Sequence, residues 1–381
     1  MASSHQDSRP LPIALRGEWP LALSLITTAL FAFFGKKWLG DLSNPLWFGF
    51  MSLWLFSVIL ASAFAIVRHA ESLATILGEP LGTLILTLAV IGIEVMMISA
   101  VMLTGTGDGK ATIARDTMFA VVMLILNGLV GLSLLLGGWK HHEQNYNFYG
   151  ANAFLALIIP LATLGMVIPN FTTSSPGPTF SPFQAVFLTL MSLGIYGVFL
   201  ATQTGRHRSY FVAPDSSEED GAAHGHGDML VRSTSFHGVL LVTYLLPLVV
   251  LAKQLAIPIE YGVKSFGAPA ALSGLIVAVI ILSPEAVTAI RAALDNQLQR
   301  SINILLGSVL ATIGLTIPAV LTIGLFTRKT VVLGLSTIEM ILLLLTMGVS
   351  TLTFSGNRTN ILLGAVHLLL FFAFLMLLFE Q

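Results

Sequence analysis

The segment LGTLILTLAVIGIEVMMISAVML, residues 81–103, is long enough to cross a lipid bilayer and carries one acidic residue, Glu94, deep inside it. A second such segment, PAALSGLIVAVIILSPEAVTAIRAA, residues 269–293, carries Glu285 in the same way. A carboxylate in hydrocarbon costs roughly 2.5 to 3.5 kcal/mol on insertion scales, so acids inside membrane helices commonly mark an ion or proton path. Because the two glutamates lie at matching depth in the two halves of the chain, we expect one shared site.

The composition places the chain in the membrane. Of its 381 residues, 55% are hydrophobic and only 10% are charged, and the mean hydropathy is +0.87. A soluble domain carries about 25% charged residues. The sequence therefore predicts a polytopic membrane protein whose main partner is the lipid bilayer, with no nucleic acid among its partners. Cysteine is absent, which excludes disulfides and cysteine-based metal or iron–sulfur sites.

Apolar segments of roughly 20 residues predict about eleven membrane helices and an all-α fold. No segment shows the alternation typical of a membrane barrel. Pro160 and Pro247 interrupt the fifth and seventh segments, which leaves the count open by one. The predicted helices cover residues 19–34, 45–67, 81–103, 118–138, 153–168, 182–204, 236–251, 269–293, 302–326, 331–354 and 360–379.

A hydrophilic linker, residues 205–235, divides the predicted helices into two sets. Its core, DSSEEDGAAHGHGD at residues 215–228, cannot bury apolar surface and is typical of disorder; a solvated linker is favoured over a metal sensor. We expect four parts: a polar tail with the first helix (1–44), a first five-helix repeat (45–204), the linker, and a second five-helix repeat (236–381). Because five is odd, the two repeats are inverted relative to each other, the plan of many secondary transporters.

The sequences around the two glutamates follow a similar pattern in the two halves. Pro80 precedes Glu94 as Pro269 precedes Glu285, and each glutamate helix is followed by one rich in small residues. The small-residue stretches contain Asn127 with Gly128 in the first half, and Gly307, Ser308 and Thr312 in the second. Small residues let helices approach closely and expose backbone carbonyls, whose oxygens suit a cation shell. Asn127, Ser308 and Thr312 equally suit hydrogen bonds between helices.

Each of the other polar residues in the apolar segments has two possible roles. Pro284 leaves the carbonyl of Ile280 without its helical donor, which favours a functional kink over a packing kink. Glu339 lies nearer one end of its segment, where it suits a proton route or a side chain that snorkels to the interface. His367 is more typical of a hydrogen-bonded core histidine than of an ion ligand.

The stretch SPEAVTAIRAALDNQLQRSINILLGSVLATIGLTIP, residues 283–318, closely resembles the second signature repeat of the bacterial calcium/proton antiporters. These belong to the cation/calcium exchanger superfamily, and the chain is most similar to the ChaA type. NFTTSSPGPTF at residues 170–180 and residues 196–211 are also similar to that group. The resemblance covers the chain from about residue 45 to its end.

The resemblance implies an eleven-helix exchanger in the bacterial inner membrane that expels a cation in return for protons and needs no cofactor. By motif position it implies that Glu94 and Glu285 bind the ion, that Asn127 lines the site, and that Gly307 and Ser308 form the glycine-serine pair of the second repeat. Related exchangers also keep the linker in the cytoplasm, and the distribution of Lys and Arg favours that orientation slightly.

The chain departs from the pattern of that group around both glutamates. Many members have Gly-Asn-Ala before each glutamate, where this chain has Ile-Gly-Ile at 91–93 and Leu-Ser-Pro at 282–284. Val122 and Met123 replace the first glycine-serine pair. Several oxygen ligands are therefore missing, which keeps a sodium or potassium ion open as the cargo instead of calcium.

The chemistry of paired acids fits cation/proton exchange. Calcium takes six to eight oxygen ligands, which two carboxylates, carbonyls, amide or hydroxyl oxygens and water supply. When the cation leaves, two neighbouring acids in a low dielectric cannot both stay charged, so protons bind in its place. The chain has no phosphate-binding Gly-x-x-x-x-Gly-Lys-Ser/Thr motif, which indicates an ion gradient as the energy source. A channel and a membrane enzyme are the remaining alternatives, and the sequence offers no nucleophile or metal motif for the enzyme.

Overall fold

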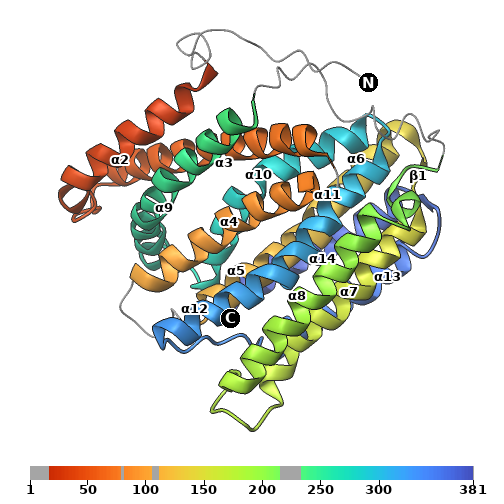
Figure 1. Ribbon diagram of the computed structural model, residues 1–381. Coiled ribbons are helices and arrows are strands. Elements are labelled where there is room, and N and C mark those ends of the chain that lie inside the picture. The colour runs from red at the N-terminus through yellow and green to blue at the C-terminus, as the bar shows by residue number, and fades with distance from the viewer. Residues whose placement is uncertain (1–16, 79–80, 105–110, 215–232, 381) are drawn as a thin grey trace. The chain divides into compact units, whose positions relative to one another are not determined.

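The computed structural model describes most of the chain, and Figure 1 shows the described parts as a set of long helices. Pro80 and the core of the predicted linker, residues 215–228, lie outside the described residues. The described residues are 17–78, 81–104, 111–214 and 233–380.

Packing divides the chain into two compact units, each built from segments that are distant in sequence. Unit 1 comprises Met1–Thr104 and Ala222–Gly267, and unit 2 comprises Gly105–Gly221 and Ala268–Gln381. Each unit therefore takes helices from both predicted repeats. The repeat boundaries themselves stay a prediction.

Unit 1 is a bundle of long helices. Within it α3 and α9 lie side by side, and both α2 and α4 pack against this pair (Figure 1). Its described helices are α2 (Trp19–Trp38), α3 (Pro45–Leu77), α4 (Leu81–Thr104) and α9 (Thr234–Ser265).

Local signals fix both ends of α3. Asn44 precedes the helix, and its side-chain oxygen accepts hydrogen bonds from the backbone N–H groups of Leu46, at 3.0 Å, and Trp47, at 3.3 Å. Pro45 occupies the first helical position, where its missing N–H costs nothing. Gly78 ends the helix with φ +62°, a positive value that glycine adopts without strain.

Unit 2 contains the remaining described elements, and three of its helical runs include a π-helical turn. A two-residue strand pair, β1 with β2, is antiparallel and joins two of the turns between helices. In chain order the elements are α5 (Ile113–Met123), η3 (Leu124–Leu129), α6 (Val130–His141), β1 (Gln144–Asn145), α7 (Phe148–Ala162), η4 (Thr163–Val167), η5 (Ile168–Asn170), α8 (Pro182–Thr204), η6 (Arg208–Phe211), α10 (Ala271–Leu294), α11 (Leu298–Ala311), η8 (Thr312–Thr316), α12 (Ile317–Thr327), α13 (Thr337–Thr353), β2 (Arg358–Thr359) and α14 (Ile361–Phe379).

Glycines allow a close crossing of α6 and α14 in unit 2. A Cβ atom added at Gly364 of α14 would lie 2.5 Å from the backbone N of Leu135 and 2.8 Å from the backbone O of Gly131. A Cβ atom added at Gly131 of α6 would lie 2.9 Å from the backbone N of Leu368. Glycine on both helices therefore brings the two backbones into contact, as in membrane helix pairs generally.

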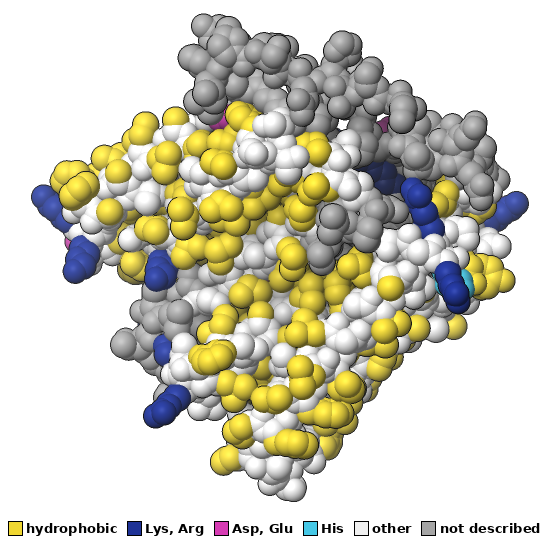
Figure 2. Space-filling model, in the orientation of Figure 1, with side chains coloured by type: hydrophobic (Ala, Val, Ile, Leu, Met, Phe, Trp, Pro, Cys, Tyr) yellow, Lys and Arg dark blue, Asp and Glu magenta, His cyan; other side chains and the backbone are white. Residues whose placement is uncertain are grey.

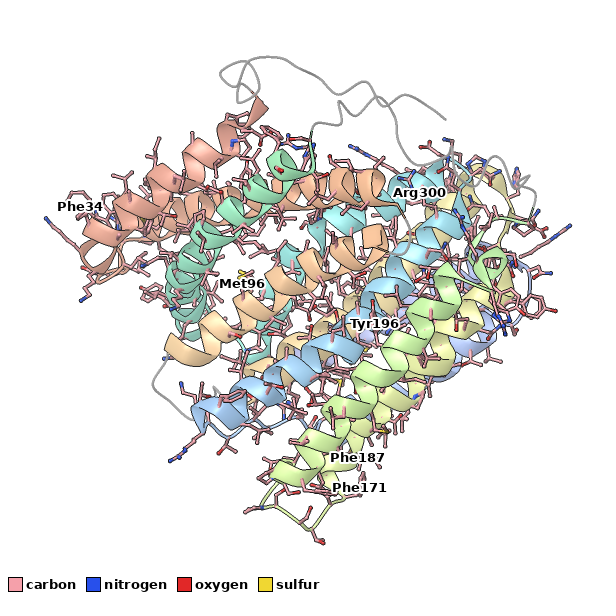
Figure 3. The ribbon with its side chains drawn as sticks, viewed as in Figure 1. Phe34, Met96, Phe171, Phe187, Tyr196 and Arg300 are labelled. Atoms are coloured by element: carbon pink, nitrogen blue, oxygen red, sulfur yellow. The ribbon has the colours of Figure 1, made fainter. Side chains whose placement is uncertain are left out.

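The described helices carry an apolar surface that suits a bilayer. Within the described residues, nine continuous helical runs are long and apolar enough to cross a membrane, three of them made of consecutive α- and π- or 3₁₀-helical elements. The parts 87–99 and 337–353 add two shorter apolar stretches. Large apolar side chains point outward, among them Leu46 at 85% exposure and Phe187 at 57%. Figure 2 shows hydrophobic side chains over much of the visible surface, and Phe187 is labelled on α8 in Figure 3. The predicted all-α, polytopic membrane architecture is confirmed.

Helix bounds differ most from the prediction in two places. Helix α9 continues fourteen residues beyond its predicted end at Leu251, through Pro258, to Ser265. Its last turns pack against α3, where a Cβ atom at Gly262 would lie 3.0 Å from the ring of Phe48, and tertiary packing outweighs the lost hydrogen bond. Helix α13 begins at Thr337 rather than Val331, because residues 329–336 are non-helical and the N–H of Leu335 bonds to the carbonyl of Met166.

Candidate ion-binding site

Glu94 lies within α4, far from either end of the helix. The residue is 2% exposed, between Ile93 at 3% and Met97 at 2%. The helix around it packs against α3 and α9 of the same unit. An acid in this position costs free energy unless it binds a proton, a cation or a polar partner, so its placement supports an ion-handling role.

Glu285 lies in the middle of α10, directly after Pro284. The helix runs without interruption from Ala271 to Leu294, so the proline removes one backbone donor without ending it. The hydroxyl of Ser308, on α11, donates a hydrogen bond of 2.5 Å to Oε2 of Glu285. The structure thus brings together two of the predicted site residues, one from each of two consecutive helices.

We expect the change Ser308→Ala to weaken cation binding. A hydrogen bond to a charged group contributes roughly 1.5 to 3 kcal/mol, so its loss lowers affinity about tenfold or more if Ser308 holds Glu285 in the binding geometry. Ser301→Ala is a matched control on the same helix, because the Ser301 hydroxyl is buried without a hydrogen-bond partner in the described structure. Cation titration of both purified variants measures the effect. Equal affinities would show that the Ser308 contact does not serve binding.

Asn127 is fully buried at the junction between α5 and α6, inside η3. Its side-chain amide donates to Oγ1 of Thr346 at 2.8 Å, and its side-chain oxygen lies 3.4 Å from Nδ1 of His367. Nε2 of His367 lies 2.9 Å from Oγ1 of Thr353. Both polar ends of Asn127 thus face side chains of α13 and α14. The same contacts agree with the prediction that His367 is a hydrogen-bonded histidine of the core. In this state Asn127 links helices.

π-helical turns interrupt the third helical run of each predicted repeat. In the first half η3 contains Asn127 and Gly128, and in the second half η8 begins at Thr312. A π-turn shifts the backbone hydrogen-bond register and is frequent at functional sites. A third π-turn, η4, lies in the following run of the first half, so the correspondence between the two halves stays a prediction.

Gly307 directly precedes Ser308 on α11, and Thr312 follows the last residue of that helix. A Cβ atom added at Gly307 would lie 3.7 Å from the ring of Phe154, an ordinary contact, so this glycine is not required by helix packing. Thr312 is 1% exposed. Their predicted roles as ion ligands stay predictions.

Glu339 has a structural role that its position in the sequence concealed. It lies in the first turn of α13, where it forms a capping box with Ser336: the N–H of Ser336 donates to Oε2 of Glu339 at 2.7 Å, and the N–H of Glu339 donates to the Ser336 hydroxyl at 3.4 Å. Sequence reasoning missed its neighbour Asp116, at the start of α5. Asp116 and Glu339 line one small pocket, and Arg115 forms an ion pair of 2.7 Å with Asp116.

The predicted site residues fall in both units. Glu94 belongs to unit 1, whereas Glu285, Ser308, Asn127 and Glu339 belong to unit 2, as do Gly307 and Thr312. Among the described residues, no group of three or more His, Cys, Asp or Glu side chains is arranged to hold a metal ion. The convergence of Glu94 with Glu285 stays a prediction.

Comparison with known proteins decides the family. The family model described as sodium/calcium exchanger protein matches residues 47–205 and 236–380, two blocks separated by the predicted linker. The chain belongs to the sodium/calcium exchanger family. The exchanger is therefore a multi-pass transport protein of a bacterial inner membrane, as the apolar segments and the resemblance indicated.

Three relatives are similar to the exchanger over most of their length. The putative ionic transporter y4hA of Sinorhizobium fredii is 43% identical over 84% of this chain and 86% of its own. The sodium-potassium/proton antiporter ChaA of Escherichia coli is 42% identical over the same shares of the two chains. A Ca²⁺/H⁺ antiporter of Aphanothece halophytica is 22% identical over 82% of this chain and 87% of its own.

Solved structures share the fold of the exchanger. The structure of native YfkE has a TM-score of 0.70 at 18% identity and covers 95% of this chain and 100% of its own. The crystal structure of the H⁺/Ca²⁺ exchanger CAX has a TM-score of 0.64 at 16% identity, over 96% of this chain and 89% of its own. At these identities the likeness concerns the fold alone.

Proposed function

We propose that the exchanger carries Ca²⁺ in one direction and protons in the other, through one site that Glu94 and Glu285 share. The observation that carries the proposal is the pair of carboxylates inside membrane helices, one of them held by Ser308, in a chain of the sodium/calcium exchanger family. Two carboxylates balance the charge of one divalent cation, and two protons balance the same pair when the cation leaves.

The proposed cycle needs no group beyond the chain itself. With both glutamates ionised, their oxygens and neighbouring backbone carbonyls and water hold the cation. Protons displace the cation because two adjacent carboxylates in a low dielectric do not both remain charged. Exposure of the site first to one side of the membrane and then to the other couples the two fluxes, and we propose that the amino terminus lies on the cytoplasmic side.

Sodium or potassium exchange for protons is the second candidate, and a specific observation favours it. The residues before both glutamates lack the asparagine of the Gly-Asn-Ala pattern that the resemblance leads one to expect, and Asn127 is bonded to Thr346 and faces His367. A monovalent ion needs fewer negative ligands than calcium does. The name of the Escherichia coli relative, a sodium-potassium/proton antiporter, agrees with this candidate.

Transport by the purified protein in proteoliposomes separates the two candidates. We expect an imposed Ca²⁺ gradient to drive proton movement, with Na⁺ and K⁺ less effective at equal ionic strength. Vesicles without protein and vesicles with Glu285→Gln control for leakage. Proton movement driven by Na⁺ or K⁺ and unaffected by Ca²⁺ would select the second candidate.

A further inference from the structure

A group of five side chains in unit 1 joins the amino-terminal end of α2 to α3 and α9, and the proposed transport cycle does not use it. Oε2 of Glu18 accepts hydrogen bonds from Nη2 of Arg68 at 2.6 Å and from the Tyr244 hydroxyl at 2.9 Å, and it lies 3.2 Å from Nε2 of His69. On the other side of the same ring, Nδ1 of His69 lies 3.0 Å from Nδ1 of His237. We call these residues the Glu18 cluster.

Glu18 serves α3 and α9 rather than its own helix. It occupies the N-cap position of α2, yet its side chain makes no capping hydrogen bond. Burial would raise the pKa of Glu18, but the hydrogen bonds from His69 and Tyr244 and the charge of Arg68 outweigh it and lower the pKa to about 2. A carboxyl with a lowered pKa stays ionised above that value, so Glu18 is a fixed negative charge throughout the range in which histidine titrates.

The contact between the two histidines sets a limit on how many protons the cluster holds. Both rings are buried, His69 at 2% exposure and His237 at 5%. Two ring nitrogens 3.0 Å apart form a hydrogen bond only when one carries a proton and the other a lone pair. One added proton is accommodated, because His69 as imidazolium then donates to Glu18 through Nε2 and to His237 through Nδ1. A second added proton charges both rings. It places two N–H groups and two positive charges against each other.

We propose that the Glu18 cluster is a proton-operated switch that holds α9 against α3 when the histidine pair carries at most one extra proton and releases it when both rings are charged. The switch responds to pH on the side of the membrane where α2 begins, since Glu18 precedes that helix and His237 lies in the first turn of α9. It regulates exchange rather than binding the transported ion.

The charges around the histidine pair favour this behaviour. Glu18 and Arg68 cancel each other, so the cluster carries about one positive charge after the first proton and about two after the second. Among the described residues of α9, Tyr244 is an ionisable group beside the pair, with its hydroxyl on Glu18. The remaining charged groups of α2, Lys36 and Lys37, lie in its last turn, at the opposite end from Glu18.

Other ionisable groups on the helices that pack together in unit 1 lie farther along each helix than the residues of the Glu18 cluster. Glu71 follows His69 by two residues on α3, and Lys253 follows Tyr244 by nine residues on α9. Helix α4, which packs against both α3 and α9, contributes Glu94. A change in the contact between α3 and α9 therefore reaches the helix that carries a proposed ion ligand.

The absence of cysteine from the native sequence makes a direct test simple. Spin labels attached at Ala74→Cys on α3 and Ser235→Cys on α9 report the distance between the two helices in the full-length protein in lipid nanodiscs. We expect this distance to lengthen and broaden as the pH is lowered from about 8, because two charged rings repel each other when both histidines carry the added protons. In His237→Gln, which does not take up the second proton, we expect the distance to stay as it is at about pH 8.

Exchange in proteoliposomes gives the second readout, with pH varied only on the amino-terminal side. We expect the acid-side loss of exchange to move by about one pH unit or more toward acid in His237→Gln, while His207→Gln, an exposed histidine outside the cluster, follows the parent. His69→Gln replaces His237→Gln if the latter does not fold.

The proposal is overturned if the parent distance does not change with pH, or if the glutamine variant lengthens as the parent does. It is equally overturned if the acid-side loss of exchange is the same in the glutamine variant and the parent. The distance measurement does not depend on which cation is carried, so failure of the proposed calcium exchange would leave the pH-dependent distance intact.

Discussion

Replacing Glu285 with glutamine is expected to abolish cation-driven proton movement while the protein still folds. Glutamine keeps the size of the side chain and the hydrogen bond with Ser308 but removes the charge and the proton that the cycle exchanges. Two unit charges 4 Å apart interact by about 4 kcal/mol at an effective dielectric of 20, so cation affinity should fall on the order of a thousandfold. Glu94→Gln should have an effect of similar size.

A matched control is available on the surface of unit 1. Glu260 forms an exposed ion pair with Lys264 one turn further along α9, at 2.8 Å, and Glu260→Gln should leave both transport and stability near those of the parent. Proton flux driven by a cation gradient measures all three variants. Normal coupled flux in Glu285→Gln would remove that carboxylate from the mechanism, and the same result in Glu94→Gln would remove the other.

The change Gly364→Leu is expected to destabilise unit 2 strongly. Even a Cβ atom at this position would lie 2.5 Å from the backbone of Leu135 on α6, so a larger side chain forces α14 and α6 apart. Overpacking of a well-packed contact costs typically 1 to 3 kcal/mol, and a backbone clash lies at about the upper end of that range or beyond it. We expect a lower yield of folded protein and a lower midpoint of thermal unfolding in detergent.

The control for this prediction is a glycine in the neighbouring helix. Nothing lies within 4 Å of a Cβ atom added at Gly348 on α13, so Gly348→Leu should unfold at nearly the temperature of the parent. Thermal unfolding followed by fluorescence of the purified proteins compares the two variants. Equal midpoints would mean that the crossing of α6 and α14 relaxes without cost.

Hydrophobic length was sufficient to locate the membrane helices, because an apolar run that crosses a bilayer is long and contains few charges. It did not locate their ends where other forces act. Helix α9 extends through Pro258 because its last turns pack against α3, and α13 starts late because Ser336 caps it. The π-helical turns also escaped prediction, since no sequence pattern used for helix assignment distinguishes them.

The sequence identified the acidic residues of the candidate site more readily than its other residues. Glu94 and Glu285 stand out because an acid in an apolar run is costly, and the contact of Ser308 with Glu285 agrees with its predicted role. The contacts of Asn127 with Thr346 and His367 join helices distant in sequence, so spacing along the chain does not reveal them. The Glu18 cluster was missed for the same reason.

The proton count of cation binding tests most directly whether one pair of acids serves both ions. Calorimetric titration of the purified exchanger with Ca²⁺, repeated in buffers with different heats of ionisation, gives the number of protons released per cation bound. We predict proton release in the parent protein, and loss of both the binding and the release in the double variant Glu94→Gln with Glu285→Gln. Cation binding without proton release, or unchanged binding in the double variant, would contradict the shared site.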